Sequence, residues 1–341
     1  MTDPGAIDEI VHRAAPVLRA AGVSPPDRLE RLTGGGNNRV YLVASAGAPV
    51  VLKVYFRDPS DPRDRLRADY GFSSFAWEVG ARALPQPLAS DHAAGMAVYE
   101  FVAGRKLASG EVTAAHVAEA ASFFRAVNEH RETRRAATLP EASEACFSIA
   151  SHAACVDRRV ARLDGIDVAS PLGGEAAELV GRRIAPAWHR VRESVLAAAG
   201  TGVDEPLAVI DRCLSPSDFG FHNAILAADG RLRFLDFEYA GHDDPAKMAC
   251  DFFCQPAVPV PREHLPVFVA SLASLWGAPS AFRRRVELLL PVYELKWCCI
   301  MLNEFLPDDG RRTFAGAVVD RGARRAAQLA KVNAALDRLN A

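Results

Sequence analysis

The stretch that decides the fold is LSPSDFGFHNAIL (residues 214–226) together with RLRFLDFEY (residues 231–239). Asp218 and Asn223 share one loop, and short apolar runs on either side of an Asp-Gly pair are typical of a β-hairpin. Because a hairpin turns the chain back on itself, we expect Asp236 to lie beside Asn223. The pattern therefore predicts a compact set of two carboxylates and one amide.

This set of side chains is suited to phosphoryl transfer. Such a reaction needs a group that orients and deprotonates the attacking hydroxyl, and oxygen ligands for a Mg²⁺ ion near the transferred phosphate. Asp218 could fill the first role, and Asn223 with Asp236 the second. The alternative is that all three are Asx residues that only stabilise turns. The spacing of the complete set favours the chemical interpretation.

A glycine-rich segment, LTGGGNNRVY (residues 32–41), lies between two predicted strands near the N-terminus. Bare backbone of this kind can approach a nucleotide and offer N–H groups to phosphate oxygens. The segment lacks the Gly-Lys-Ser/Thr ending and the following helix of a Walker A loop, so a plain hairpin turn is an equally good interpretation.

Lys53 follows in VVLKV (residues 50–54), where strand alternation directs its ammonium beneath the glycine-rich segment. A buried lysine needs a partner, and nucleotide phosphates or an acid of the next helix are candidates. Asp69, sixteen residues further on, is the best acid, and Glu78 is the fallback. An exposed lysine on an edge strand is the alternative.

Hydrophobic periodicity predicts an α+β protein with an N-terminal lobe over residues 1–103 and a C-terminal lobe over residues 104–341. The second lobe is predicted to be mainly helical, with one strand hairpin. The strands expected in the first lobe are Arg39–Ala44, Val50–Phe56, Gln86–His92 and Met96–Val102, with helices over 6–22 and Arg63–Val79. The helices expected in the second lobe are 113–131, 142–163, 173–200, Val267–Trp276, Arg283–Phe305 and Arg312–Leu339.

Composition limits the classes of partner. The chain has 341 residues, is 50% apolar and carries a net charge of -2, which gives no general field for nucleic acid or an anionic membrane. The seven cysteines show no repeated CxxC spacing, so we expect reduced thiols in the cytoplasm. No signal peptide or membrane span is predicted, because Pro291, Glu294 and Lys296 interrupt the one long apolar stretch. The oligomeric state is left open.

In order and spacing, these motifs resemble the aminoglycoside phosphotransferase and choline kinase superfamily, which are small-molecule kinases with a protein-kinase-like fold. The resemblance covers most of the chain. It implies two lobes, an N-terminal one with an antiparallel sheet and a helix and a mainly α-helical C-terminal one. It also implies transfer of the γ-phosphate of ATP or GTP, with Mg²⁺, to a hydroxyl of an amino sugar, a sugar or a choline-like alcohol.

The resemblance assigns a role to each motif residue. Asp218 would be the catalytic base, and Asn223 and Asp236 the metal ligands. The nucleotide would be held by a phosphate clamp, by the glycine loop and by backbone groups of the hinge between the lobes. These nucleotide-binding positions are Lys53 and Asp69, then Gly35, Gly36 and Asn38, then Glu100 and Val102.

The catalytic loop departs from the family pattern, which usually has a histidine two residues before the base and another two residues after it. Here these positions hold Pro216 and Gly220. The departure allows an alternative function, a nucleotide-binding pseudokinase with a regulatory role. His222 would either restore a cation near the phosphate or serve as a packing histidine. A protein kinase is disfavoured, because no Ala-Pro-Glu segment follows Asp236.

Overall fold

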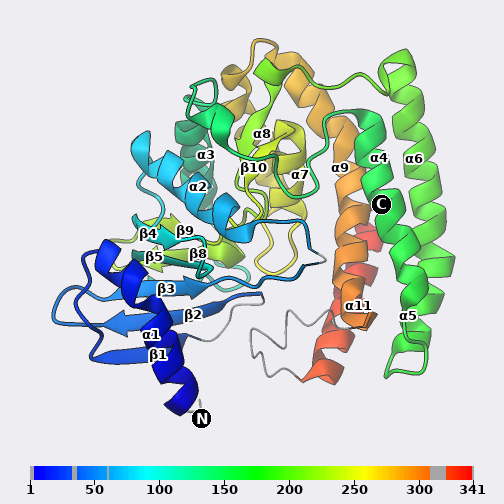
Figure 1. Cartoon of the computed structure of the whole chain (residues 1–341). Helices are drawn as coiled ribbons and strands as arrows, with labels where there is room; N and C mark the ends of the chain where they lie inside the picture. The colour runs from blue at the N-terminus through cyan, green and yellow to red at the C-terminus, as the bar shows by residue number, and fades with distance from the viewer. Residues whose placement is uncertain (1–3, 33–36, 60, 308–319, 340–341) are drawn as a thin grey trace.

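The computed structural model describes residues 4–32, 37–59, 61–307 and 320–339. The chain forms two lobes, an N-terminal lobe built on a β-sheet and a C-terminal lobe built mainly of helices (Figure 1). This architecture confirms the predicted α+β fold class. The exact boundary between residues 103 and 104 stays a prediction.

The N-terminal sheet is antiparallel, with the strand order β1-β2-β3-β5-β4. Its first strand was not predicted, because its sequence RLERL has only two apolar residues and lies at the sheet edge, where most side chains reach solvent. The other strands lie within two residues of their predicted bounds. The bounds are β1 Arg28–Leu32, β2 Arg39–Ala44, β3 Val50–Val54, β4 Pro87–Asp91 and β5 Met96–Glu100.

One helix covers each face of this sheet. Helix α1 (Pro4–Ala20) packs on the face that carries Val50, Leu52 and Val54 of β3. Alternation along the strand places Val51 on the opposite face, where α2 (Arg65–Glu78) contributes Leu66 to a separate apolar cluster. Lys53 shares the side of Val51, so its ammonium points toward α2, as predicted.

Helix α9 (Pro279–Leu302) is the centre of the C-terminal lobe and packs against α4, α6, α7 and α11 (Figure 1). Pro291 lies inside this helix without ending it. A π-helical turn, Val180–Ile184, joins α5 to α6. No described helix is both long and apolar enough to cross a bilayer. The remaining bounds are α3 Ala114–Asn128, α4 Ile149–Arg162, α5 Gly173–Leu179, α6 Ala185–Ala199, α7 Pro245–Cys254, α8 Leu265–Leu272 and α11 Arg321–Leu339.

The helix predicted over 142–163 begins later than expected, at Ile149. Ser148 caps it, because its hydroxyl accepts a hydrogen bond from the amide of Ser151 at 3.1 Å. Upstream, Glu144 has a φ of 57°, a left-handed conformation that is incompatible with a helix. The segment before the cap is therefore irregular, and it lies against the strands that follow the catalytic loop.

Short strands hold the two functional loops. Strand β7 (Cys213–Ser215) pairs with β10 (Gly241–Asp243), and β8 (Ala224–Ala227) pairs with both β6 (Gly104–Arg105) and β9 (Leu232–Phe234). Gly241 is required by a close approach, because a Cβ there would lie 2.3 Å from the carbonyl oxygen of Pro140. The loop with Asp218 thus joins β7 to β8, and the loop with Asp236 joins β9 to β10.

Candidate active site

The hairpin formed by β8 and β9 brings the three predicted catalytic and metal-binding residues together. The amide of Leu235 donates to the carbonyl oxygen of Asn223 at 2.8 Å, which places Asp236 next to that loop. The side-chain Nδ2 of Asn223 donates to the carbonyl oxygen of Asp218 at 3.0 Å and to its Oδ2 at 3.3 Å. The proximity expected from the sequence is present.

Lys53 connects the two lobes at this point. Its Nζ lies 2.6 Å from Oδ2 of Asp69 on α2 and 2.5 Å from Oδ1 of Asp236. Burial alone would lower the pKa of Lys53, but the attraction of Asp236 and Asp69 outweighs it and raises the pKa well above its usual value. Lys53 is therefore a buried, charged ammonium between two carboxylates.

Asp69 is fixed by its other contacts. The hydroxyl of Tyr55 donates to its Oδ2 at 2.7 Å, and the amide of Phe237 donates to its Oδ1 at 3.1 Å. Glu78, the fallback acid, lies at the end of α2 and pairs instead with Arg135 at 3.2 Å. Of the two acids, Asp69 is the one that the structure brings to Lys53.

Asp236 has an unusual backbone conformation, with a φ of 67° although it is not a glycine. Its side chain is 38% exposed, whereas that of Lys53 is only 9% exposed. Strained backbone in an otherwise ordered loop is concentrated at functional sites, where the surrounding structure holds it in place. The carboxylate is thus held against Lys53 on one side and is open to solvent on the other.

Asp218 is partly open to solvent, with a side chain that is 36% exposed. Burial raises its pKa, but hydrogen bonds from His222 and Asn223 outweigh this effect and leave the pKa below its usual value. Nε2 of His222 lies 3.2 Å from Oδ1 of Asp218. The carboxylate is therefore ionised at neutral pH, as a proton acceptor must be.

Glu238 was not among the predicted site residues. It is buried, and it connects the loop that carries Asp236 to the N-terminal lobe. It accepts hydrogen bonds from Nδ2 of Asn37 at 2.6 Å and from Nδ2 of Asn38 at 2.7 Å, and it pairs with Arg65 of α2 at 3.2 Å. The only sequence signal was an acid two residues after Asp236. Its partners are about two hundred positions away, beyond any local pattern.

The predicted nucleotide-binding residues fall into three places. Asn38 is buried, with its amide on Glu238 and its Oδ1 accepting from the amide of Phe56 at 3.1 Å. Glu100 ends β5, where its amide donates to the carbonyl oxygen of Gln86 at 2.9 Å, and Val102 follows in the connection to β6. Gly35 and Gly36 lie outside the described residues. Nucleotide binding by these residues stays a prediction.

The donor set at this site fits a magnesium ion. Across the described ranges, no three or more His, Cys, Asp or Glu side chains form a group able to hold a metal by themselves. Asn223 uses its NH₂ group on Asp218, so oxygen is the atom that it offers, and Asp236 offers a carboxylate. Mg²⁺ commonly takes one or two protein oxygens and completes its coordination with phosphate oxygens and water.

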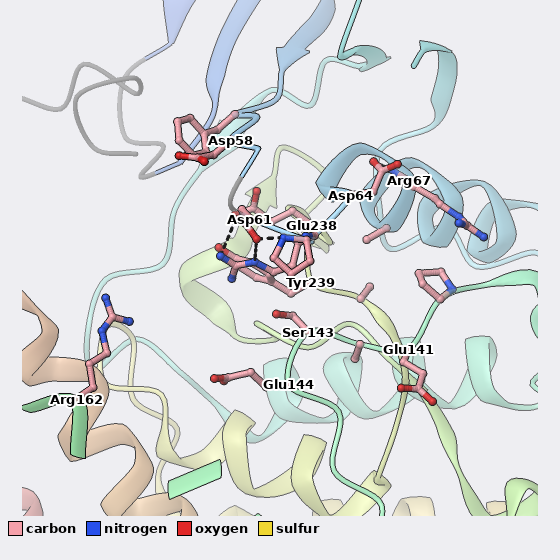
Figure 2. Close-up of a pocket in the computed structure, with 17 residues that line it drawn as sticks. Asp58, Asp61, Asp64, Arg67, Glu141, Ser143, Glu144, Arg162, Glu238 and Tyr239 are labelled. Atoms are coloured by element: carbon pink, nitrogen blue, oxygen red, sulfur yellow. Dashed lines mark hydrogen bonds and ion pairs between the residues drawn. The ribbon is translucent and has the colours of Figure 1, made fainter. Parts of the chain in front are cut away.

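A cleft of about 950 Å³ is lined in part by Glu238 and Tyr239, which follow Asp236 in the chain (Figure 2). Figure 2 shows Asp61 near α2 and Glu144 of the 140–144 segment on opposite walls. Within the described part of the chain, its lining contains neither Asp218 nor the two candidate metal ligands. The charged residues that line it are the acids Asp58, Asp61, Asp64, Glu141, Glu144 and Glu238 and the arginines Arg63, Arg67 and Arg162. Carboxylates therefore outnumber guanidinium groups on this face.

Solved structures share the fold across almost the whole chain. A choline/ethanolamine kinase family protein from Mesorhizobium loti has a TM-score of 0.56 at 20% identity and covers 97% of this chain and 99% of its own. A spectinomycin phosphotransferase in complex with ADP and spectinomycin has a TM-score of 0.63 at 9% identity, covering 96% and 98%. A choline kinase from Streptococcus pneumoniae has a TM-score of 0.56 at 15% identity, covering 96% and 98%.

Sequence comparison adds the family. No curated protein matches the chain in sequence. The model of the phosphotransferase enzyme family matches residues 28–288, which include both lobes and every candidate site residue. With that match over most of its length, and with the kinase-like fold around Lys53 and Asp218, the chain belongs to the phosphotransferase enzyme family.

Proposed function

We propose that this protein is a Mg²⁺-dependent small-molecule kinase, which transfers the γ-phosphoryl group of ATP or GTP to a hydroxyl of its acceptor. The observation that carries the proposal is the contact of Lys53 with Asp69 and Asp236, at 2.6 and 2.5 Å, beside the hydrogen-bonded pair Asp218 and Asn223. Phosphoryl transfer depends on positioning and on charge stabilisation, and this arrangement provides groups for both.

Each residue of the set has a distinct role in the proposal. Asp218 accepts the proton of the acceptor hydroxyl, since its pKa lies below the usual value and its side chain is open to solvent. Asn223 and Asp236 would hold the magnesium ion, and the ion would supply positive charge near the transferred phosphate. Lys53 contacts the α- and β-phosphates, and Asp69 keeps its ammonium in place.

On the nucleotide side, residues 1–103 form the binding lobe. Gly35 and Gly36 are assigned to phosphate binding, and Asn38, whose Nδ2 donates to Glu238 at 2.7 Å, belongs to the same binding lobe. Backbone groups around Glu100 and Val102 contact the base. Residues 104–341 then supply the catalytic loop and the acceptor site.

For the acceptor, we propose an amino sugar, a sugar or a choline-like alcohol. The structural neighbours whose names include spectinomycin phosphotransferase and choline kinase support this class. In the cleft beside Glu238 and Tyr239, the acids Asp61, Glu144 and Glu238 are already paired with arginines. Asp64 and Glu141 are the cleft acids that support an acceptor with a positive charge. Cationic alcohols therefore belong first in any screen.

A nucleotide-consumption screen tests the proposal. ATP and GTP are each incubated with Mg²⁺ and a panel of cationic and neutral alcohols, and nucleoside diphosphate is measured. Asp218→Asn should lower turnover by roughly 10²- to 10⁴-fold, the usual contribution of a general base. Asp229→Asn, at an exposed turn of the same hairpin, is the matched control and should retain full activity. Turnover that survives Asp218→Asn would remove Asp218 from its role.

The same samples distinguish the pseudokinase alternative, which Pro216 and Gly220 motivate. Nucleotide that binds only the folded state raises the melting temperature, and the stabilisation grows with the logarithm of its concentration relative to Kd. A melting temperature raised by Mg²⁺-ATP without turnover on any alcohol would contradict the kinase and favour a regulatory nucleotide-binding protein.

A further inference from the structure

The catalytic loop has no side chain at position 220, and a histidine ring lies in the space that one would take. A Cβ placed on Gly220 would lie 2.8 Å from Nδ1 and 3.1 Å from Cε1 of His222. The backbone itself does not demand glycine, because its φ of 170° is extended and open to any residue. The ring of His222 is therefore the feature that requires Gly220.

The ring has one partnered and one unpartnered nitrogen. Nε2 lies 3.2 Å from Oδ1 of Asp218, and the histidine side chain is 18% exposed. Nδ1 is buried, and none of the described residues offers it a hydrogen bond. A buried nitrogen without a partner is unfavourable and rare in folded proteins. The ring therefore holds this position despite an unfavourable environment for Nδ1.

The backbone around the ring is also fixed. His222 belongs to the 3-10 turn Phe221–Asn223, and the side chain of Phe221 is fully buried. Nζ of Lys106 donates to the carbonyl oxygen of His222 at 3.1 Å. The next residue, Asn223, bonds to the other carboxylate oxygen of Asp218. Both oxygens of the base thus have a partner from the same turn.

We propose that His222 is a positioning residue that orients the carboxylate of Asp218 by donating a hydrogen bond from Nε2 to Oδ1. This inference rests on the proposed function, in which Asp218 is the base. A carboxylate oxygen can only accept, so Nε2, at 3.2 Å from Oδ1, is the donor of this pair. With Asn223 on Oδ2 and His222 on Oδ1, the base keeps one orientation toward the acceptor hydroxyl. Gly220 provides the space for this arrangement.

The proposal predicts a loss in kcat rather than in substrate binding. A misplaced catalytic group slows the chemical step by about 10- to 100-fold, while the substrates bind elsewhere. His222→Phe keeps a ring beside Gly220 but removes the donor, so kcat should fall by about this factor with the KM values for ATP and acceptor nearly unchanged. His222→Gln places an N–H group near the Nε2 position and should recover most of the lost kcat.

Gly220→Ala moves the ring without changing its chemistry. The added methyl meets the His222 ring and, at 3.7 Å, Cγ of Gln255, so the ring has to shift and Nε2 should leave Asp218. The melting temperature shows whether the variant folds normally. Its kcat should fall to the level of His222→Phe. His222→Ala leaves no ring in this space, so adding Gly220→Ala to it should change kcat less than twofold. A Gly220→Ala effect that depends on the His222 ring identifies the contact between the two positions.

The measurements are turnover of Mg²⁺-ATP with the best alcohol of the panel, hydrolysis of ATP by water as a second probe, and the melting temperature of each variant. Activity that survives Asp218→Asn would overturn the role of Asp218 as the base, and with it the role of His222. Loss of activity in Asp218→Asn with full kcat in His222→Phe would overturn only the role of His222. Equal losses in His222→Phe and His222→Gln, with lower melting temperatures in both, would also overturn it, because a structural role would then explain the data.

Discussion

The protein contains two sets of buried lysines, and they differ in one respect. Lys53 lies between Asp69 and Asp236, and the second of these carboxylates is 38% exposed. In the C-terminal lobe, Lys247 and Lys296 meet on Asp251, at 3.7 Å and 3.0 Å, and no side chain in that group is more than 8% exposed. One set is open to solvent at a carboxylate and the other is closed.

Under the proposed function, the difference separates a binding site from a structural element. The closed set is saturated by its own contacts, since Nε1 of Trp297 also donates to Asp251 at 2.8 Å and Lys247 contacts Asp243. Burial lowers the pKa of Lys247, but Asp243 and Asp251 outweigh it and raise the pKa above the usual value. A lysine in such a set has a structural role, whereas the proposed function has Lys53 exchange a carboxylate partner for a phosphate.

The largest effect is expected in the closed set. Lys296→Met should lower the free energy of unfolding by about 3–5 kcal/mol, because it leaves the buried charge of Asp251 short of its nearest cation. Urea unfolding measures the change. Lys331→Met is the matched control, because this lysine is exposed and its Nζ donates to the carbonyl oxygen of Pro256 at 3.1 Å. Equal stability of the two variants would remove the distinction between closed and exposed lysines.

The second prediction concerns the effect of Lys53 on activity. Lys53→Met should lower kcat/KM by at least about 100-fold, close to 3 kcal/mol of transition-state stabilisation. Its loss of stability should be smaller than that of Lys296→Met, because Tyr55 and Phe237 still bond to Asp69 and water can reach Asp236. Steady-state kinetics and urea unfolding of the same samples check both parts. A stability loss as large as that of Lys296→Met would show that Lys53 belongs with the structural lysines.

A third prediction concerns the stability of the protein in acid, which depends on a buried carboxylate of the C-terminal lobe. Burial raises the pKa of Asp244, but hydrogen bonds from His152 and the charge of Arg285 outweigh it and lower the pKa to about 2. The native state therefore releases this proton more readily than the unfolded state. The resulting stability of about 2 kcal/mol is complete above roughly pH 4 and is lost as the pH falls through about 2.

Unfolding measured at several pH values tests this dependence. In Asp244→Asn, the free energy of unfolding should fall less steeply between pH 4 and 2 than in the original protein. Asp229→Asn should change the slope less, because the hydrogen bonds from Arg231 and Arg233 that lower the pKa of Asp229 lie at an exposed turn, where solvent screens them. Identical slopes in Asp244→Asn and the original protein would contradict the assignment.

The smallest effect is expected for an exposed lysine that contacts the catalytic loop. Lys106 is exposed and donates to the carbonyl oxygen of His222 at 3.1 Å. Lys106→Ala should change the free energy of unfolding by less than about 1 kcal/mol, since exposed contacts contribute little. The melting temperature should shift by only a few degrees. A larger loss would mean that an exposed contact can matter as much as the closed set.

The parts of the site that could be predicted from sequence are those encoded by neighbouring residues. The return of Asp236 to Asn223 follows from a short hairpin, and the meeting of Lys53 with Asp69 follows from a strand and the helix after it. Both depend on secondary structure that local patterns specify.

The remaining contacts join distant segments and leave no local signal. Glu238 meets Asn38 across 200 positions, and Asp251 meets Lys296 across 45. The His222 ring occupies space that a side chain at position 220 would take. In the sequence, Gly220 appears only as a departure from the family pattern of the catalytic loop. Strand β1 was missed because its polar sequence resembles a loop.

Under the proposed function, the ion pair between Lys53 and Asp236 has a thermodynamic consequence. Lys53 serves as an internal counter-ion for Asp236. Phosphates that draw Lys53 away free this carboxylate for magnesium, and magnesium on the carboxylate frees Lys53 for phosphates. Linkage requires that the two effects be equal, so nucleotide and metal should each raise the affinity of the other, and either alone should bind weakly.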